Sequence, residues 1–296
     1  MQKTLSRPAS PAVVSNTIVP SGKIVIEPPS GLPHINWREL LAYRDLFYFM
    51  VRRDIQVLYR QTVLGLAWAF LRPFISMILF TFIFGRVARL SSDGVPYPLF
   101  SYTALVPWTY FATVVQTATT SLITNSNMLT KVYFPRLVFP LTPVLSKLPD
   151  FLLALGLLPV FMVVYRVWPT PYVLVLPVLV VMMAATAAGL GMWLAALAVQ
   201  YRDVNHASQF LIQILMFAAP VVWPVSLMTA RFGETARLLY GLYPMVGVIE
   251  GFRAALLGTV PMPWDLIGIG AVSASALLFS GAYYFRHMER RFADVA

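Results

Sequence analysis

The sequence predicts an all-helical membrane protein with several membrane-spanning helices, and three observations predict this fold class. Hydrophobic residues make up 58% of the 296 residues and charged residues only 11%, less than half of the roughly 25% usual in soluble domains. The mean hydropathy is +0.72. The apolar runs are long and continuous, whereas a membrane-spanning barrel alternates apolar and polar residues. An ordinary soluble enzyme and a disordered chain are both excluded.

The first segment, residues 1–35, differs from the rest of the chain. It is rich in proline and has no apolar core of the kind that marks a signal peptide. We predict a disordered cytoplasmic tail here and a transmembrane domain over 36–296.

Residues 37–58 predict an amphipathic helix that lies in the membrane interface, because apolar side chains recur on one helical face. A soluble helix packed on a partner is the alternative. The apolar face comprises Trp37, Leu40, Leu41, Tyr48, Val51 and Ile55.

Six later segments are predicted spans, since a span needs about 20 mostly apolar residues. They are residues 62–85, 98–122, 149–166, 171–199, 207–228 and 264–285.

Residues 229–263 are apolar but interrupted by charges, Gly and Pro. They predict two short re-entrant helices that dip into the membrane from the outer side and return, sheltered by protein. The residues expected to form an outer gate here are Arg237, Tyr243, Pro244, Met245, Glu250 and Arg253.

The positions of the basic residues predict the orientation. The net charge is +10, from 22 Lys and Arg against 12 Asp and Glu. In a membrane protein such an excess marks cytoplasmic loops, so we expect no nucleic-acid partner. With the N-terminus inside, 16 of the 22 basic residues lie on the cytoplasmic side and 6 outside. Both termini are therefore predicted to be cytoplasmic.

We find no pattern of catalytic or metal-binding residues in the sequence. There is no cysteine, and the phosphate-binding motif GxxxxGK[ST] is absent. The three histidines, far apart and without metal-ligand spacing, are His34, His206 and His287. We predict a transport subunit with no catalytic residue, no metal and no cofactor of its own.

Two predicted spans carry polar residues along one helical face. Hydroxyls, amides and aromatic rings suit a sugar, because they hydrogen-bond its hydroxyls and stack on its apolar C–H faces. The alternative is hydrogen bonding between packed spans. The second-span residues expected to line a substrate channel are Tyr102, Thr109, Thr113, Gln116 and Thr120, and those of the fifth are Gln209, Gln213, Met216 and Trp223.

The loop 125–136 mixes bulky apolar residues with two cations. Its predicted position is cytoplasmic, and a patch of this kind indicates a docking surface for a soluble partner. A loop stabilised by lipid at the interface is the alternative.

Five short motifs occur in order along the chain. They are Trp37-Arg38-Glu39-Leu40, the run from Arg53-Asp54-Ile55 to Trp68 with Pro73, Lys131-Val132-Tyr133-Phe134-Pro135-Arg136, Tyr201-Arg202-Asp203-Val204, and Tyr243-Pro244-Met245. Over 37–296 the chain resembles the ABC-2 family, and more narrowly the permease subunits of O-antigen, capsule and teichoic acid exporters. Tyr243 replaces the usual Asn of that family, and the tail lies outside the pattern.

The resemblance implies six spans per subunit in the bacterial inner membrane, with re-entrant helices before the last span. It also implies a homodimer with two ATP-binding cassette subunits, which carry ATP and Mg, and outward movement of a lipid-linked polysaccharide. The residues it places at the ATPase contact are Arg38, Arg53, Met128, Lys131, Tyr133, Phe134, Pro135 and Arg136.

Three other functions remain open at this point. An ABC-2 exporter of a drug or small lipid is the first alternative. An ion- or proton-coupled transporter needs more ionisable residues within the spans than this chain has. A membrane-embedded glycosyltransferase needs paired acids near a membrane surface, which we do not find.

Overall fold

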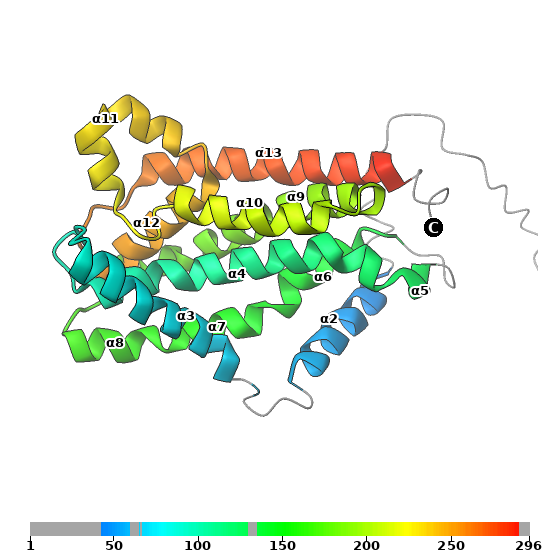
Figure 1. Cartoon of the computed structure of the whole chain (residues 1–296), viewed down its shortest axis with the longest axis horizontal. Helices are drawn as coiled ribbons and strands as arrows, with labels where there is room; N and C mark the ends of the chain where they lie inside the picture. Colours follow the sequence, from blue (N-terminus) through cyan, green and yellow to red (C-terminus); the bar gives the residue numbers. More distant parts are fainter. Residues whose placement is uncertain (1–42, 60–64, 66, 130–134, 290–296) are drawn as a thin grey trace, which may run out of the picture. The chain divides into compact units, whose positions relative to one another are not determined.

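The computed structural model describes residues 43–59, 65, 67–129 and 135–289. These residues belong to one compact unit, Pro33–Ala296, and every regular element among them is a helix (Figure 1). The elements are α2 (Arg44–Tyr59), α3 (Ala67–Phe80), η1 (Thr81–Val87), α4 (Tyr97–Thr124), α5 (Ser126–Leu129), α6 (Val138–Ser146), α7 (Leu148–Gly156), α8 (Leu158–Tyr165), η2 (Pro171–Val175), α9 (Leu176–Gln200), α10 (Val204–Ala218), α11 (Val225–Tyr240), α12 (Pro244–Leu257) and α13 (Trp264–Glu289). The predicted tail and the predicted contact residues Arg38, Lys131, Tyr133 and Phe134 lie outside the described residues.

Four segments are long and apolar enough to cross a membrane, which makes the chain a multi-pass membrane protein. They are Ala67–Val87, Val138–Tyr165, Pro171–Gln200 and Trp264–Glu289. Val138–Tyr165 corresponds to the predicted third span, 149–166, and starts well before residue 149, so the predicted start of that span is wrong. The reason is that proline does not stop this segment: Pro149 lies in the first turn of α7, where no backbone N–H is needed.

The predicted fifth span is also shorter than expected. α10 ends at Ala218, and the next residue, Ala219, has an extended backbone with ψ 153°. Pro220 follows, and a residue before proline is driven out of the helical region by the proline ring. The chain then continues without helix until α11 begins after Pro224. Residues 219–228 are therefore a connection and the start of another helix, not the end of a span.

Helix α9 packs against both α4 and α13, and two glycines allow the second of these contacts. A Cβ atom placed on Gly281 would lie 2.4 Å from the carbonyl oxygen of Gly189. A Cβ on Gly189 would in turn lie 2.6 Å from the backbone of Leu277. Only glycine at these positions lets the two backbones approach so closely, as is typical of helices packed in lipid.

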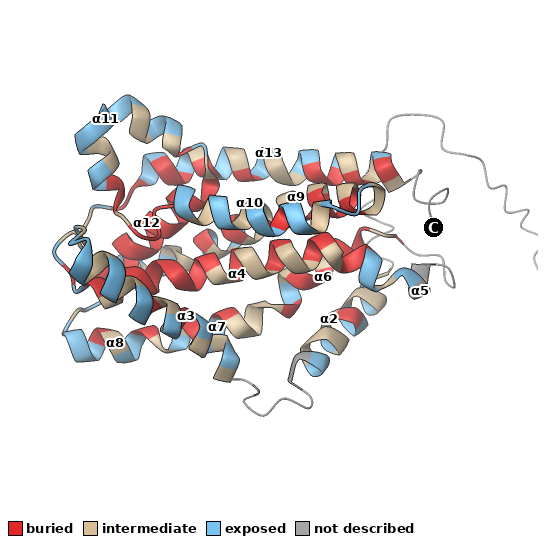
Figure 2. Ribbon diagram, in the orientation of Figure 1, coloured by how far each residue is buried: buried red, intermediate tan, exposed pale blue. Residues whose placement is uncertain are grey.

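Helix α12 is enclosed by protein along its whole length. Every residue from Pro244 to Leu257 is buried (Figure 2), by contacts with α4, α9 and α13. α11, by contrast, is mostly exposed and bends at Gly233, whose φ is 82°. These two helices lie at the end of the bundle opposite to α2 and α5 (Figure 1).

Helix α2 packs against α6, and the side of α2 predicted to meet the membrane interface is not the side that makes this contact. Met50 is only 1% exposed, whereas Tyr48, predicted on the apolar face, is 66% exposed. The packed side of α2 also carries Arg53, which the sequence places away from the apolar side. Contact with α6 and with the end of α4 thus decides the orientation of this helix.

Candidate functional site

The polar face predicted for the second span is present on α4. Its half-buried members are Thr109, Thr113, Gln116 and Thr120. Tyr102, predicted on the same face, is instead fully buried, and its hydroxyl donates a 2.9 Å hydrogen bond to the carbonyl oxygen of Ala154. Its ring also meets Phe161 edge-on, with the centroids 5.0 Å apart. At this level α7 and α8 cover α4, so Tyr102 is a packing residue.

The threonines of this face are largely satisfied by their own helix. Thr113 donates to the carbonyl oxygen of Thr109 at 2.7 Å, and Thr117 donates to that of Thr113 at 2.7 Å. This is the usual back-bonding of hydroxyls in a helix. It leaves each hydroxyl oxygen able to accept a further hydrogen bond, so the face presents acceptors to the space beside α4.

Gln116 joins α4 to α10. Its side-chain nitrogen donates to Asn205 at 3.1 Å, and Ser208 donates to its side-chain oxygen at 3.4 Å. The single Ser208 hydroxyl hydrogen is shared with the backbone oxygen of Asn205, the nearer acceptor at 2.8 Å. This cross-helix group was not predicted, because Asn205 precedes the predicted fifth span, 207–228, and Ser208 lies off its polar face.

Three neighbouring cavities follow the polar face of α4, and together we name them the α4 groove. The α3–α4–α10 cavity, about 350 Å³, is lined in part by Gln116 and Gln209. The α3–α4–α7 cavity, about 280 Å³, shares Arg72 and Thr113 with it. The α2–α4–α6 cavity, about 300 Å³, shares Thr117 with the first. The α4 groove is therefore a run of cavities beside one long helix, lined by hydroxyl, amide and basic side chains among apolar ones such as Val106 and Phe151.

The predicted fifth-span residues do not form one continuous face. Gln209 lines the α4 groove, while Gln213 is exposed and Met216 is half-buried on α10. Trp223 lies beyond the end of α10, and its indole N–H donates to the carbonyl oxygen of Ala219 at 3.3 Å. The period of 3.6 residues does not extend to Trp223, because the helix has already ended.

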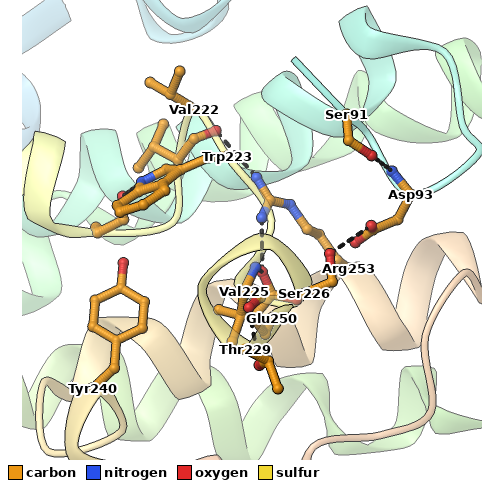
Figure 3. Close-up of polar contacts among 12 residues, drawn as sticks. Ser91, Asp93, Val222, Trp223, Val225, Ser226, Thr229, Tyr240, Glu250 and Arg253 are labelled. Atoms are coloured by element: carbon orange, nitrogen blue, oxygen red, sulfur yellow. Dashed lines mark hydrogen bonds and ion pairs between the residues drawn. The ribbon is translucent and has the colours of Figure 1, made fainter. Parts of the chain in front are cut away.

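The predicted gate residues Glu250 and Arg253 form a buried ion pair on α12 (Figure 3). Arg253 donates to the Glu250 carboxylate at 2.9 Å and to the carbonyl oxygen of Val221 at 3.1 Å. Its guanidinium carbon lies 3.5 Å from the centroid of the Phe100 ring. Glu250 also accepts the backbone N–H of Val225 at 3.4 Å. The pair thus joins α12 to α4 and to both ends of the 221–225 connection.

Two further hydrogen bonds join the 88–96 loop and the start of α4 to this connection. Ser226 donates to Asp93 at 2.8 Å (Figure 3), and the Tyr97 hydroxyl donates to the carbonyl oxygen of Val222 at 2.7 Å. The partners are 133 and 125 residues apart in the chain. No local sequence pattern could have predicted such contacts.

Arg237, another predicted gate residue, lies on α11 between two acids. It donates to Glu234 and, at 3.0 Å, to Asp265. Partial burial opposes its charge, but the hydrogen bonds to Asp265 and Glu234 outweigh this, so the pKa of Arg237 is raised. The remaining predicted gate residues are half-buried or buried: Tyr243, Pro244 and Met245.

At the other end of the bundle, Arg53 connects α2 to the start of the predicted docking loop. It donates to Asp54 at 2.8 Å, to Asn125 at 3.1 Å and to the sulfur of Met128 at 3.5 Å. Two of the predicted contact residues, Arg53 and Met128, are therefore brought together.

The end of the same loop is joined to the end of α13. The backbone N–H of Arg136 donates to the Glu289 carboxylate at 3.2 Å, and its side chain donates to the Glu289 carbonyl oxygen at 3.3 Å. Pro135, beside it, is buried. Glu289 was not predicted at this contact.

Comparison with known proteins gives consistent matches. The family described as ABC-2 type transporter matches residues 45–257. The chain is 33% identical over 258 residues to the O-antigen export system permease protein RfbA of Myxococcus xanthus, a match that covers 87% of this chain and 97% of the relative. It is 24% identical over 252 residues to a protein of the same name from Klebsiella pneumoniae, covering 85% and 95% of the two chains.

Proposed function

We propose that this chain, which belongs to the ABC-2 type transporter family, is the permease subunit of an ATP-driven exporter of an O-antigen-like polysaccharide. The observation that carries the proposal is the match over nearly the whole length of a relative named as an O-antigen export permease. The hydroxyl and amide side chains along the α4 groove can hydrogen-bond the hydroxyls of a sugar, and the apolar side chains between them can pack on its C–H faces.

The proposed topology has six passes through the bacterial inner membrane, with both termini in the cytoplasm. α4 is 28 residues long and α10 only 15, and in this topology each forms a pass in addition to the four apolar segments. α11 and α12 then form the re-entrant pair at the outer side. The burial of all of α12 supports this assignment, because a helix that ends inside a membrane needs protein around its unpaired backbone groups.

The proposed glycan path follows the α4 groove and α10 in a homodimer. The path residues carried forward are Thr109, Thr113, Gln116, Thr120, Gln209, Gln213, Met216 and Trp223. A polymer that moves in steps needs many weak contacts, and a hydrogen bond exchanged with water contributes only about 1 kcal/mol net. The path ends at the connection after α10, which Glu250 and Arg253 of α12 orient through hydrogen bonds to Val225 and Val221.

Two ATP-binding cassette subunits, which bind ATP and Mg, would drive the cycle from the cytoplasmic side. In this proposal they dock on the 125–136 loop and on the amphipathic helix predicted over 37–58, most of which is α2 in the structure. Arg53 joins α2 to the start of that loop and Arg136 joins its end to α13. A movement of the ATP-binding subunits would therefore reach two separate parts of the bundle, which is the requirement for coupling two states.

Complementation tests the proposal. A strain that lacks its own O-antigen permease is given this chain together with its ATP-binding subunit, and surface polysaccharide is measured with an antibody. We expect surface polysaccharide only when both subunits are present. The control is the same strain with this chain alone. If no surface polysaccharide forms although both subunits are confirmed in the membrane, the proposed substrate class is contradicted.

A further inference from the structure

The α3–α4–α7 cavity contains two basic side chains. Arg72 of α3 and Lys147, which lies between α6 and α7, line the same space of about 280 Å³. Among the described residues that line it, Asp150 is the single acid. The lining itself therefore carries one more cation than acids, and Asp54 is a second acid close enough to act on Lys147.

Both cations lie within segments that are long and apolar enough to cross a membrane. Arg72 follows the start of the segment Ala67–Val87, and Lys147 follows the start of the segment Val138–Tyr165. Charges within membrane-crossing segments are costly, and they pair with opposite charges or mark the path of a charged substrate.

Arg72 is shared between the basic cavity and the amide-bearing part of the α4 groove. It is exposed and lines the α3–α4–α10 cavity as well, with Gln116 and Gln209. A ligand with its anionic part between Arg72 and Lys147 would thus place the next atoms beside the amides. Trp68, 46% exposed, lines the cavity on α3, and its indole suits contact with an alkyl chain.

We propose that Arg72 and Lys147 bind the diphosphate that joins a glycan to its lipid carrier. This inference rests on the proposed function, because it places the lipid-linked end of the substrate beside the glycan path. A guanidinium pairs with two phosphate oxygens at once, and an ammonium supplies a point charge. Trp68 contacts the lipid chain, and the sugar extends toward Gln116 and Gln209.

Binding of farnesyl diphosphate to the purified complex with its ATP-binding subunits tests the site. The complex is held in nanodiscs of phosphatidylcholine, and affinity is measured by thermophoresis. Farnesol has the same chain without the charge, and we expect it to bind at least roughly tenfold more weakly. Arg72→Gln and Lys147→Gln should each weaken diphosphate binding roughly tenfold, and Arg72→Lys should retain part of it. Arg231→Gln on the exposed part of α11 is the matched control and should bind as the unaltered chain does.

Two results would overturn the proposal. One is unchanged diphosphate binding in a folded Arg72→Gln/Lys147→Gln variant. The other is equal competition by phosphatidylglycerol, which would make this a general site for anionic headgroups. Elution profile and co-purification of the ATP-binding subunits report folding, and Lys147→Gln carries the test if Arg72→Gln does not fold. Because the assay contains no glycan, its failure is distinguishable from a failure of the complementation experiment.

Discussion

Arg253 donates a 2.9 Å hydrogen bond to Glu250, one turn earlier on α12, and both side chains are buried. The same guanidinium lies over the Phe100 ring and donates to the Val221 carbonyl oxygen. Burial of an ion pair costs much of the energy that its attraction supplies. We therefore expect the pair to matter chiefly for orientation: it selects one packing of α12 against α4 and the connection after α10.

Glu250→Gln and Arg253→Gln should each destabilise the protein strongly. Removing one partner leaves the other as an unpaired charge in the core, which costs about 3–5 kcal/mol. The double variant, which leaves no charge, should be less destabilised than the sum of the two single changes. The measurement is the thermal unfolding midpoint of the purified protein in detergent, and additive effects would show that the two side chains do not act as a pair.

Arg237→Gln is the matched control, because Arg237 also has acidic partners but its side chain is 20% exposed, and those of Glu234 and Asp265 are 60% and 40% exposed. An exposed pair contributes only about 0.2–1 kcal/mol, so the unfolding midpoint should move little. The pKa of Arg237 is raised in the folded state. The contribution of Arg237 to the stability of the fold is therefore fully present below the ordinary arginine pKa. Between neutral and mildly alkaline pH Arg237 keeps its proton, so the unfolding midpoint should not change on its account.

The helical fold class could be predicted because it depends on composition and on long apolar runs, which are properties of the sequence itself. The boundaries near proline were less predictable. Pro149 continues a membrane-crossing segment as the second residue of α7, whereas Pro220 ends α10 through the residue before it. The same residue type thus has opposite effects, and the neighbouring backbone decides between them.

The candidate site was predictable where it follows one helix and not where it depends on two. The spacing of Thr109, Thr113 and Gln116 identified the polar face of α4, but the same spacing included Tyr102, which α7 and α8 cover. Arg72 and Lys147 line one cavity only because α3 and α7 pack on α4 and on each other. A helical wheel contains no information about which neighbouring helix covers which part of a face.

Substitutions of Gln209 test the glycan path. Gln209→Arg should abolish export, because a long cation would fill the α3–α4–α10 cavity beside Arg72. Gln209→Ser should reduce export only modestly, since one hydrogen bond contributes about 1 kcal/mol net. Surface polysaccharide is measured in cells in which the variant is confirmed in the membrane with its ATP-binding subunit. Normal surface polysaccharide with Gln209→Arg would show that this face only packs helices.

Replacement of Tyr133 and Phe134 with Ala tests the ATPase contact. Tyr133 and Phe134 stand in the sequence between Met128 and Arg136, which form hydrogen bonds to Arg53 and Glu289. We expect the double variant to recover much less of the ATP-binding subunit during co-purification, because large apolar side chains dominate such contacts. Tyr172→Ala, which changes an exposed aromatic of η2, the element that packs against α12, is the control and should recover it fully. Full recovery with the loop variant would place the contact elsewhere.

Cysteine labelling tests the re-entrant assignment of α11 and α12, and the natural absence of cysteine leaves no background. If residues 219–263 enter and leave on the outer side, Ser91→Cys and Arg231→Cys should both react with a membrane-impermeant maleimide on intact spheroplasts. Both positions are exposed, so access is not limited by packing. Ala296→Cys should react only after the membrane is opened, since α13 then ends in the cytoplasm. If 219–263 instead crossed the membrane once more, the chain after it would reverse. Ala296→Cys would then react on intact spheroplasts as fast as Ser91→Cys, and the six-pass arrangement would be wrong.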